Sequence, residues 1–252
     1  MDALHLILRW LHVVASIMWI GHLWFFNFVN AQLAKTYDAD SKKKVVPELM
    51  PRALYFFRWG AAYTWITGFL LLGVVYYSGG VMDSRMGSNG ASVGLSVVSL
   101  LVGFAIYDVL AKQVKDETVF GAVGFVLIVV YAFALSRVVG GRAMVIHVGS
   151  LFGTIMAANV WMRIWPAQRK IIGAIKGTSP APDASVPATA TLRSKHNTYL
   201  AVPLMFTMVA NHFPTVYGND YAWALTAIFV LIGWGLAKFL YNKSASAAPA
   251  QF

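Results

Sequence analysis

The chain has 252 residues, of which 58% are hydrophobic and 12% are charged, and its formal net charge is +10. It contains several uninterrupted apolar runs, each near the roughly 20 residues that a helix needs to cross the hydrocarbon core of a bilayer. This composition excludes an ordinary soluble domain and predicts an all-α, polytopic transmembrane helix bundle, since a single span must satisfy its own backbone hydrogen bonds. These residues contain no cysteine, which excludes disulfides, CxxC metal sites and thioether-linked c-type haem within them.

The apolar runs are accounted for by about seven transmembrane helices. In chain order we expect them at 4–30, 52–79, 92–112, 118–137, 141–164, 197–213 and 220–242. The longest polar stretch, 165–196, includes a Pro/Ala/Ser/Thr-rich segment that cannot bury a core of its own. We therefore expect a five-span membrane region at 1–164, a cytoplasmic linker at 165–196, two further spans at 197–243 and a disordered tail at 244–252.

Basic residues concentrate in alternate connections between these spans. Lys42, Lys43 and Lys44 precede the second span, and the linker at 165–196 is also basic. The opposite side carries only Arg85, Arg137 and Arg142. The positive-inside rule then predicts an N-terminus outside and a C-terminus in the cytoplasm of a bacterial cytoplasmic (inner) membrane. The positive-inside distribution of a protein in a lipid bilayer therefore explains most of the positive charge, and we expect no nucleic-acid partner.

Two histidines lie within apolar spans at similar predicted depth. At about 1.5 Å per residue, His12 lies about 12 Å from the outer end of the first span, and the depth of His147 in the fifth agrees within about 3 Å. Imidazole is costly in lipid unless it finds a partner inside the bundle. The pair therefore predicts one haem b held by two axial histidines. Arg9, Arg137 and Arg142 lie near the same level, where they could bind the haem propionates.

Other interpretations of the histidines stay open. Single histidines often make hydrogen bonds between membrane helices, and a non-haem metal site is a further alternative, although the spans offer few carboxylates. His5 and His212 are further candidates toward the outer side. His22 and His196 lie toward the cytoplasm, where a second haem is an alternative.

The fifth expected span also carries a glycine pattern. Gly149 and Gly153 are four residues apart and lie on one helix face, roughly opposite His147. Two small residues on one face let a neighbouring helix approach closely. The pattern predicts a packing contact.

Several longer strings resemble the membrane domain of the bacterial urate oxidase (urate hydroxylase) family known as PuuD. The strings are RWLHVVASIMWIG at 9–21, FRWGAAYTWITGFLLLGVVYY at 57–77, GRAMVIHVGSLFGTIMAANVW at 141–161, PAQRK at 166–170 and KHNTYLAVPLMFTMVANHFP at 195–214. They follow the family's order along most of the chain and include polar residues at membrane positions. The resemblance marks His12, His147, His196 and His212 as candidate functional positions.

The resemblance implies a multi-helix membrane domain joined to a C-terminal cytochrome c, oxidation of urate to 5-hydroxyisourate, and electrons that leave through the cytochrome. These residues contain no CxxCH motif, so we expect a relative that lacks the fused cytochrome and passes electrons to a separate c-type cytochrome. Arg142, Asn211 and His212 near the outer side are candidates to bind urate, a planar anion. The alternative is a non-catalytic haem-binding electron-transfer or assembly subunit of a larger membrane redox complex, and whether the chain is an enzyme stays open.

Overall fold

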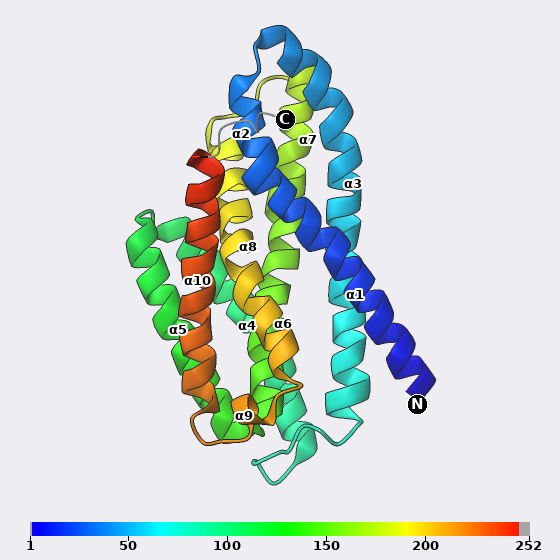
Figure 1. The fold of residues 1–252 in the computed structure, drawn as a ribbon, viewed down its shortest axis with the longest axis vertical. Coiled ribbons are helices and arrows are strands. Elements are labelled where there is room, and N and C mark those ends of the chain that lie inside the picture. Colours follow the sequence, from blue (N-terminus) through cyan, green and yellow to red (C-terminus); the bar gives the residue numbers. More distant parts are fainter. Residues whose placement is uncertain (1, 247–252) are drawn as a thin grey trace. The chain divides into compact units, whose positions relative to one another are not determined.

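The computed structural model describes residues 2–246, which are almost entirely helical and contain no strand (Figure 1). Three long helices continue into π-helical turns, and most connections between helices are short. In chain order the elements are α1 (Asp2–Trp24), η1 (Phe25–Asn30), α2 (Ala31–Leu33), η2 (Ala34–Thr36), α3 (Ala39–Leu71), η3 (Leu72–Tyr77), α4 (Asn89–Gln113), α5 (Glu117–Val138), α6 (Gly141–Asn159), η4 (Val160–Ile164), α7 (Trp165–Lys176), α8 (Ser185–Ala210), α9 (Pro214–Tyr217) and α10 (Ala222–Ser246).

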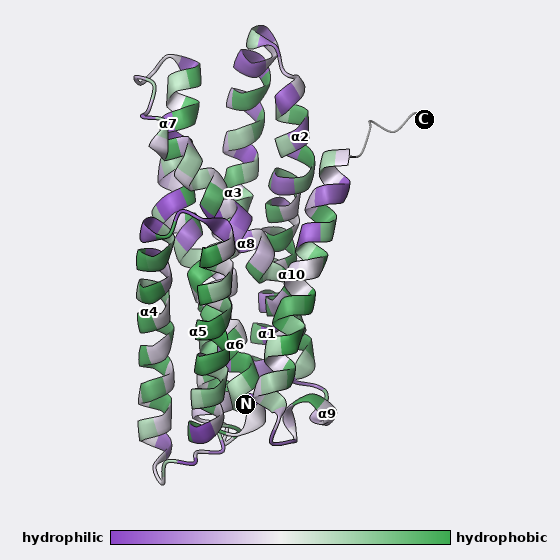
Figure 2. Ribbon diagram, turned by 90° about the vertical axis from the view of Figure 1, so that its left-hand side faces the viewer, coloured by the Kyte–Doolittle hydropathy of each residue, from purple (hydrophilic) through white to green (hydrophobic). Residues whose placement is uncertain are grey.

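Six helical segments of the described chain are long and apolar enough to cross a membrane. They are Asp2–Thr36, Ala39–Tyr77, Asn89–Gln113, Glu117–Val138, Gly141–Lys176 and Ala222–Ser246. Hydrophobic residues run along α4 and α5, whereas hydrophilic residues gather near the start of α3 and along α7 (Figure 2). The all-α, multi-pass membrane fold is therefore confirmed.

The expected span at 197–213 lies mostly in α8, which is not one of these six segments. The first half of α8 is polar and carries Arg193, Lys195 and His196. The helix therefore combines a polar half with an apolar half, and the apolar run alone is shorter than a full span. The predicted sides of the two termini stay a prediction.

The polar stretch 165–196 is more helical than a flexible linker. It contains α7 and the start of α8, and only residues 177–184 between them lie outside helices. Gly177 ends α7 in the left-handed conformation that favours glycine, with φ of 73°. Pro187 lies in the first turn of α8, where proline is tolerated. Of the expected tail at 244–252, residues 244–246 belong to α10 and 247–252 lie outside the described residues.

The chain divides into two compact units. Unit 1 comprises the residues up to Arg9, Thr67–Ile155 and Leu200–Trp234. Unit 2 comprises Trp10–Ile66, Met156–Tyr199 and the residues from Gly235 on.

Unit 1 is held together by close helix contacts at small residues. A Cβ on Gly149 of α6 would lie 2.0 Å from Thr207 Oγ1 of α8, so only glycine allows this approach. The predicted packing contact at Gly149 is thus confirmed, whereas a Cβ on Gly153 would meet nothing within 4 Å. Phe206 of α8 stacks on Phe229 of α10 with ring centroids 3.9 Å apart.

Unit 2 uses hydrogen bonds between helices in addition to apolar packing. Asn27 of η1 donates to Ser194 Oγ of α8 at 2.8 Å and accepts from the Tyr241 hydroxyl of α10 at 2.9 Å. Asn159 of α6 donates to Asn197 Oδ1 of α8 at 2.9 Å, and both residues are fully buried. Such bonds tie membrane helices together because lipid offers a polar side chain no alternative partner.

Candidate functional site

His147 and Tyr77 form a hydrogen-bonded pair inside unit 1. His147 on α6 is fully buried, and its Nδ1 lies 2.6 Å from the carbonyl oxygen of Ala143 one turn earlier. A carbonyl only accepts, so Nδ1 carries the hydrogen and donates it, which leaves Nε2 of the neutral ring as an acceptor. The hydroxyl of Tyr77, at the end of η3, donates to this Nε2 at 3.1 Å.

Tyr76 makes a second connection next to this pair. Its ring meets the His147 ring edge to face, with centroids 6.3 Å apart. Its hydroxyl donates to Asn211 Oδ1 at 2.7 Å, and the Asn211 amide donates to the Thr207 carbonyl oxygen at 2.6 Å. Tyr76 and Asn211 are both buried, so this bond links η3 to the segment that follows α8.

Arg142 completes the group. A side-chain hydrogen bond joins it to the Tyr76 hydroxyl, and its guanidinium carbon lies 6.0 Å from the centre of the Tyr217 ring in α9. Its Nε is buried and has no hydrogen-bond partner among the residues that the structure describes. No carboxylate of residues 2–246 forms an ion pair with Arg142. We call Tyr76, Tyr77, Arg142, His147 and Asn211 the Tyr76 cluster.

The local sequence explains how these side chains converge. The hydrogen bonds of the π-helical segment η3 span one residue more than those of an α-helix, which changes the direction in which Tyr76 and Tyr77 point. Gly141 begins α6, and a Cβ there would lie 2.0 Å from the carbonyl oxygen of Tyr217. Glycine at this position therefore allows α9 to approach the first turn of α6, where Arg142 lies.

Three of the predicted site residues, Arg142, His147 and Asn211, are brought together by the structure. Sequence reasoning missed the two tyrosines that connect them. The available signal was the pair of adjacent phenols at the end of an apolar span, since a buried tyrosine hydroxyl usually has a hydrogen-bond partner.

Arg9 is also placed in unit 1. It is hydrogen-bonded to His5 one turn earlier, with Arg9 Nη2 2.9 Å from His5 Nε2. The positive charge of Arg9 acts on the Tyr76 hydroxyl, as does the charge of Arg142. His5 is thus a partner of Arg9, and Arg9 adds to the positive field at the Tyr76 cluster.

The remaining outer candidates are exposed. Arg137, in the last turn of α5, lies over the ring of Phe133 one turn earlier, with its guanidinium carbon 4.6 Å from the ring centre. His212 follows α8 in a turn. Among the described residues, neither is hydrogen-bonded to, ion-paired with or stacked on the Tyr76 cluster.

His12, His22 and His196 belong to unit 2. His12 of α1 is half-buried and makes a hydrogen bond with the backbone of Thr64 in α3. His196 is half-buried in α8. Because His12 and His147 lie in different units, their pairing stays a prediction.

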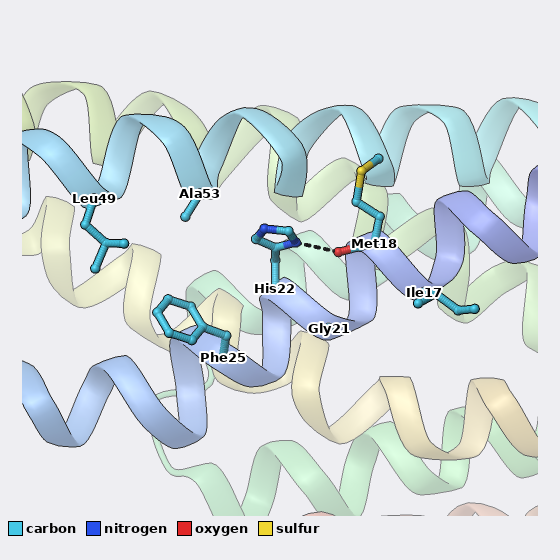
Figure 3. A pocket seen from close by; sticks show the side chains of 7 residues that line it. All are labelled: Ile17, Met18, Gly21, His22, Phe25, Leu49 and Ala53. Carbon is cyan, nitrogen blue, oxygen red and sulfur yellow. Dashed lines mark hydrogen bonds between the residues drawn. The ribbon is translucent and has the colours of Figure 1, made fainter.

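His22 lies at a groove between α1 and α3 in unit 2 (Figure 3). Its Nδ1 donates to the Met18 carbonyl oxygen at 2.7 Å, and its ring stacks on Phe56 with centroids 6.0 Å apart. The groove therefore presents one imidazole among apolar side chains.

The chemistry of His147 fits an axial haem ligand. A metal-binding histidine usually donates its other ring nitrogen to a carbonyl or carboxylate, and the Nδ1 bond to Ala143 meets this requirement. Nε2 is therefore the nitrogen with the lone pair, and its current partner is a hydroxyl rather than a cation. A site built from three or more His, Cys, Asp or Glu side chains does not occur within residues 2–246.

Comparison with known protein families gives a match over most of the chain. The family described as urate oxidase N-terminal matches residues 1–44 and 37–251, which is most of the chain. No curated protein and no solved structure matches the chain.

Proposed function

The chain belongs to the urate oxidase N-terminal family, the membrane domain of PuuD-type urate oxidases, and on this premise we propose that it oxidises urate to 5-hydroxyisourate in the bacterial cytoplasmic membrane. Its electrons pass to a separate c-type cytochrome. The reaction combines urate with water and releases two protons and two electrons. The protein must therefore bind an anionic substrate and provide an electron acceptor.

The uncompensated charge of Arg142 is the observation that carries the proposal. A guanidinium with a buried Nε and no carboxylate partner among the described residues is costly in a membrane protein unless an anion pairs with it. Urate is a planar anion whose carbonyl oxygens match the donors of a guanidinium. Tyr76 and Asn211, which are joined to Arg142 in one hydrogen-bonded group, orient the ring.

The proposed cofactor is haem b. His147 and His12 would hold it, and Arg9 and Arg137 are candidates for its propionates. The haem supplies a one-electron acceptor when bound. In this chain the Ala143 carbonyl sets the ring tautomer of His147, and Tyr77 holds the ring nitrogen that would bind iron.

The second candidate is a non-catalytic haem-binding electron-transfer or assembly subunit. Two hydrogen bonds favour it: Tyr76 to Asn211 and Tyr77 to His147 satisfy these groups within the protein. In this case the Tyr76 cluster only holds helices together, and the protein binds other redox subunits of the membrane.

Urate-dependent reduction of added cytochrome c by the purified full chain, prepared with haem available, separates the two candidates. An enzyme reduces cytochrome c at a rate that saturates with urate and shows a reduced-minus-oxidised b-haem spectrum. That spectrum is expected to persist in His22→Ala and to disappear in His12→Ala and His147→Ala. Absence of haem from the purified protein would contradict the proposed haem b cofactor. If haem is present without urate turnover and other redox proteins co-purify, the result favours the electron-transfer or assembly subunit.

A further inference from the structure

A groove on unit 2 has a chemistry that the urate reaction does not use. It lies between α1 and α3, has a cavity volume of about 440 Å³ and is lined by Met18, His22, Phe25, Leu49 and Ala53, among others. This volume falls in the range of sites that hold small molecules. Apart from the imidazole of His22, the side chains that line it are hydrophobic.

His22 offers one defined hydrogen-bonding atom to the groove. Nδ1 donates to the Met18 carbonyl oxygen, so Nε2 of the neutral ring is an acceptor. Nε2 has no partner among the residues that the structure describes. In Figure 3 the ring extends from α1 toward α3, with its second nitrogen turned away from Met18. A ligand that carries a hydroxyl can donate to this nitrogen.

The walls of the groove suit a flat ring. Phe25 lines it, and Phe56 stacks on the His22 ring at an interplanar angle of 22°. Aromatic side chains of this kind favour stacked or edge-on contacts with a second ring. The ligand therefore combines an aromatic ring with a hydroxyl.

The position of the groove points to a ligand that comes from the membrane. Both α1 and α3 belong to segments that can span a bilayer, and Ile17 at the groove is 69% exposed. Leu49 follows the exposed Lys44 by five residues, or about 7.5 Å of helix, so the groove lies close to the charged end of α3. A polar head near the charged end and an apolar tail in the hydrocarbon layer match this arrangement.

We propose that this groove binds the head ring of a membrane quinol with an apolar tail. A quinol hydroxyl donates to His22 Nε2, and the ring packs beside Phe25. The neutral imidazole accepts and does not donate at Nε2, so the site prefers the quinol to the oxidised quinone. An acyl chain would leave this nitrogen without a partner, which is unfavourable in an apolar groove. Quinol binding to this groove is measured without urate, so its test does not depend on the proposed urate reaction.

Gly21 allows the groove to be filled without disturbing the helix. It lines the groove, its φ is not positive, and a Cβ there would meet nothing within 4 Å. Gly21→Leu therefore replaces open space with a side chain and improves the helix propensity. Gly94→Leu in α4 is the matched control, because Gly94 is also exposed, helical and without neighbours within 4 Å of a Cβ.

The experiment measures saturable binding of radiolabelled decylbenzoquinol, and separately of its oxidised form, to the full chain in phosphatidylcholine nanodiscs. We expect Gly21→Leu to raise the dissociation constant of the quinol at least tenfold and Gly94→Leu to change it less than twofold. His22→Leu removes one hydrogen bond, so it raises the constant about fivefold and abolishes the preference for the reduced form.

Any of four binding results would overturn the proposal. They are no saturable binding to the unmodified chain, an unchanged constant in Gly21→Leu, equal weakening in Gly94→Leu, and displacement of the quinol by decanol at equal concentration, which would assign the groove to a hydrocarbon chain. Loss of b-haem absorbance in His22→Leu would instead assign this nitrogen to iron and also overturn it. Failure of urate turnover leaves this binding result unchanged, so the two proposals fail separately.

Discussion

Replacement of Tyr76 by phenylalanine removes one hydroxyl from the centre of the Tyr76 cluster. The hydroxyl donates to Asn211 Oδ1 at 2.7 Å, and the exposed fractions of the two residues are 6% and 5%. In Tyr76→Phe the Asn211 amide still donates to Thr207, whereas Oδ1 stays buried without a donor. A buried polar atom that loses its partner costs about 1–3 kcal/mol, and Arg142 loses an acceptor as well.

Thermal unfolding of the purified full chain in detergent measures this cost. At about 2–4 °C per kcal/mol for a chain of this size, a cost of about 1–3 kcal/mol should lower Tm by about 2–12 °C. Tyr221→Phe is the control, because Tyr221 is 72% exposed and its hydroxyl makes no hydrogen bond among the described residues. We expect its Tm to change by less than about 2 °C, as is usual for surface substitutions. Equal Tm values for the two variants would refute the account of Tyr76 as a buried link between η3 and Asn211.

Two further predictions follow from the contacts of α6. Gly149→Val should lower Tm by several degrees, because its Cβ would meet Thr207 and overpacking of this kind costs about 1–3 kcal/mol. Gly153→Ala should leave Tm unchanged or raise it slightly, because a Cβ there meets nothing within 4 Å. A larger fall of Tm in Gly153→Ala than in Gly149→Val would contradict the close approach at Gly149. Tyr77→Phe leaves His147 Nε2 without its donor, so the apoprotein should be less stable in thermal unfolding, while the haem content per chain should not fall. A loss of haem in Tyr77→Phe as large as that in His147→Ala would contradict the assignment of iron binding to His147.

The spans could be predicted well where the helix ends coincide with the ends of an apolar run. The expected ranges 92–112 and 118–137 agree closely with α4 and α5, and Asp116 caps the start of α5 by accepting from the backbone amides of Thr118 and Val119. The expected range 52–79 begins well after the start of α3, because this helix continues beyond its apolar part and contains Pro47 and Pro51. Hydropathy locates the part of a helix that suits lipid, not the full helix.

The candidate site could be predicted only in part. Arg142, His147 and Asn211 were identifiable as polar residues in or beside apolar spans. Their connection through Tyr76 and Tyr77 depends on the π-helical turn η3, which shifts the direction of these side chains relative to an ideal helix. A regular period of 3.6 residues contains no information about such a turn, so the partners could not be paired from the sequence.

The urate dependence of cytochrome c reduction in Arg142→Gln tests the central claim most directly. Loss of a charge-assisted hydrogen bond costs about 1.5–3 kcal/mol, so the KM for urate should rise at least tenfold, with haem content unchanged. Arg85→Gln is the matched control, because Arg85 is exposed and its guanidinium donates to the Ser136 carbonyl oxygen at 2.7 Å, and the KM of this variant should change less than twofold. Equal KM values for Arg142→Gln and the unmodified chain would contradict urate binding at the Tyr76 cluster.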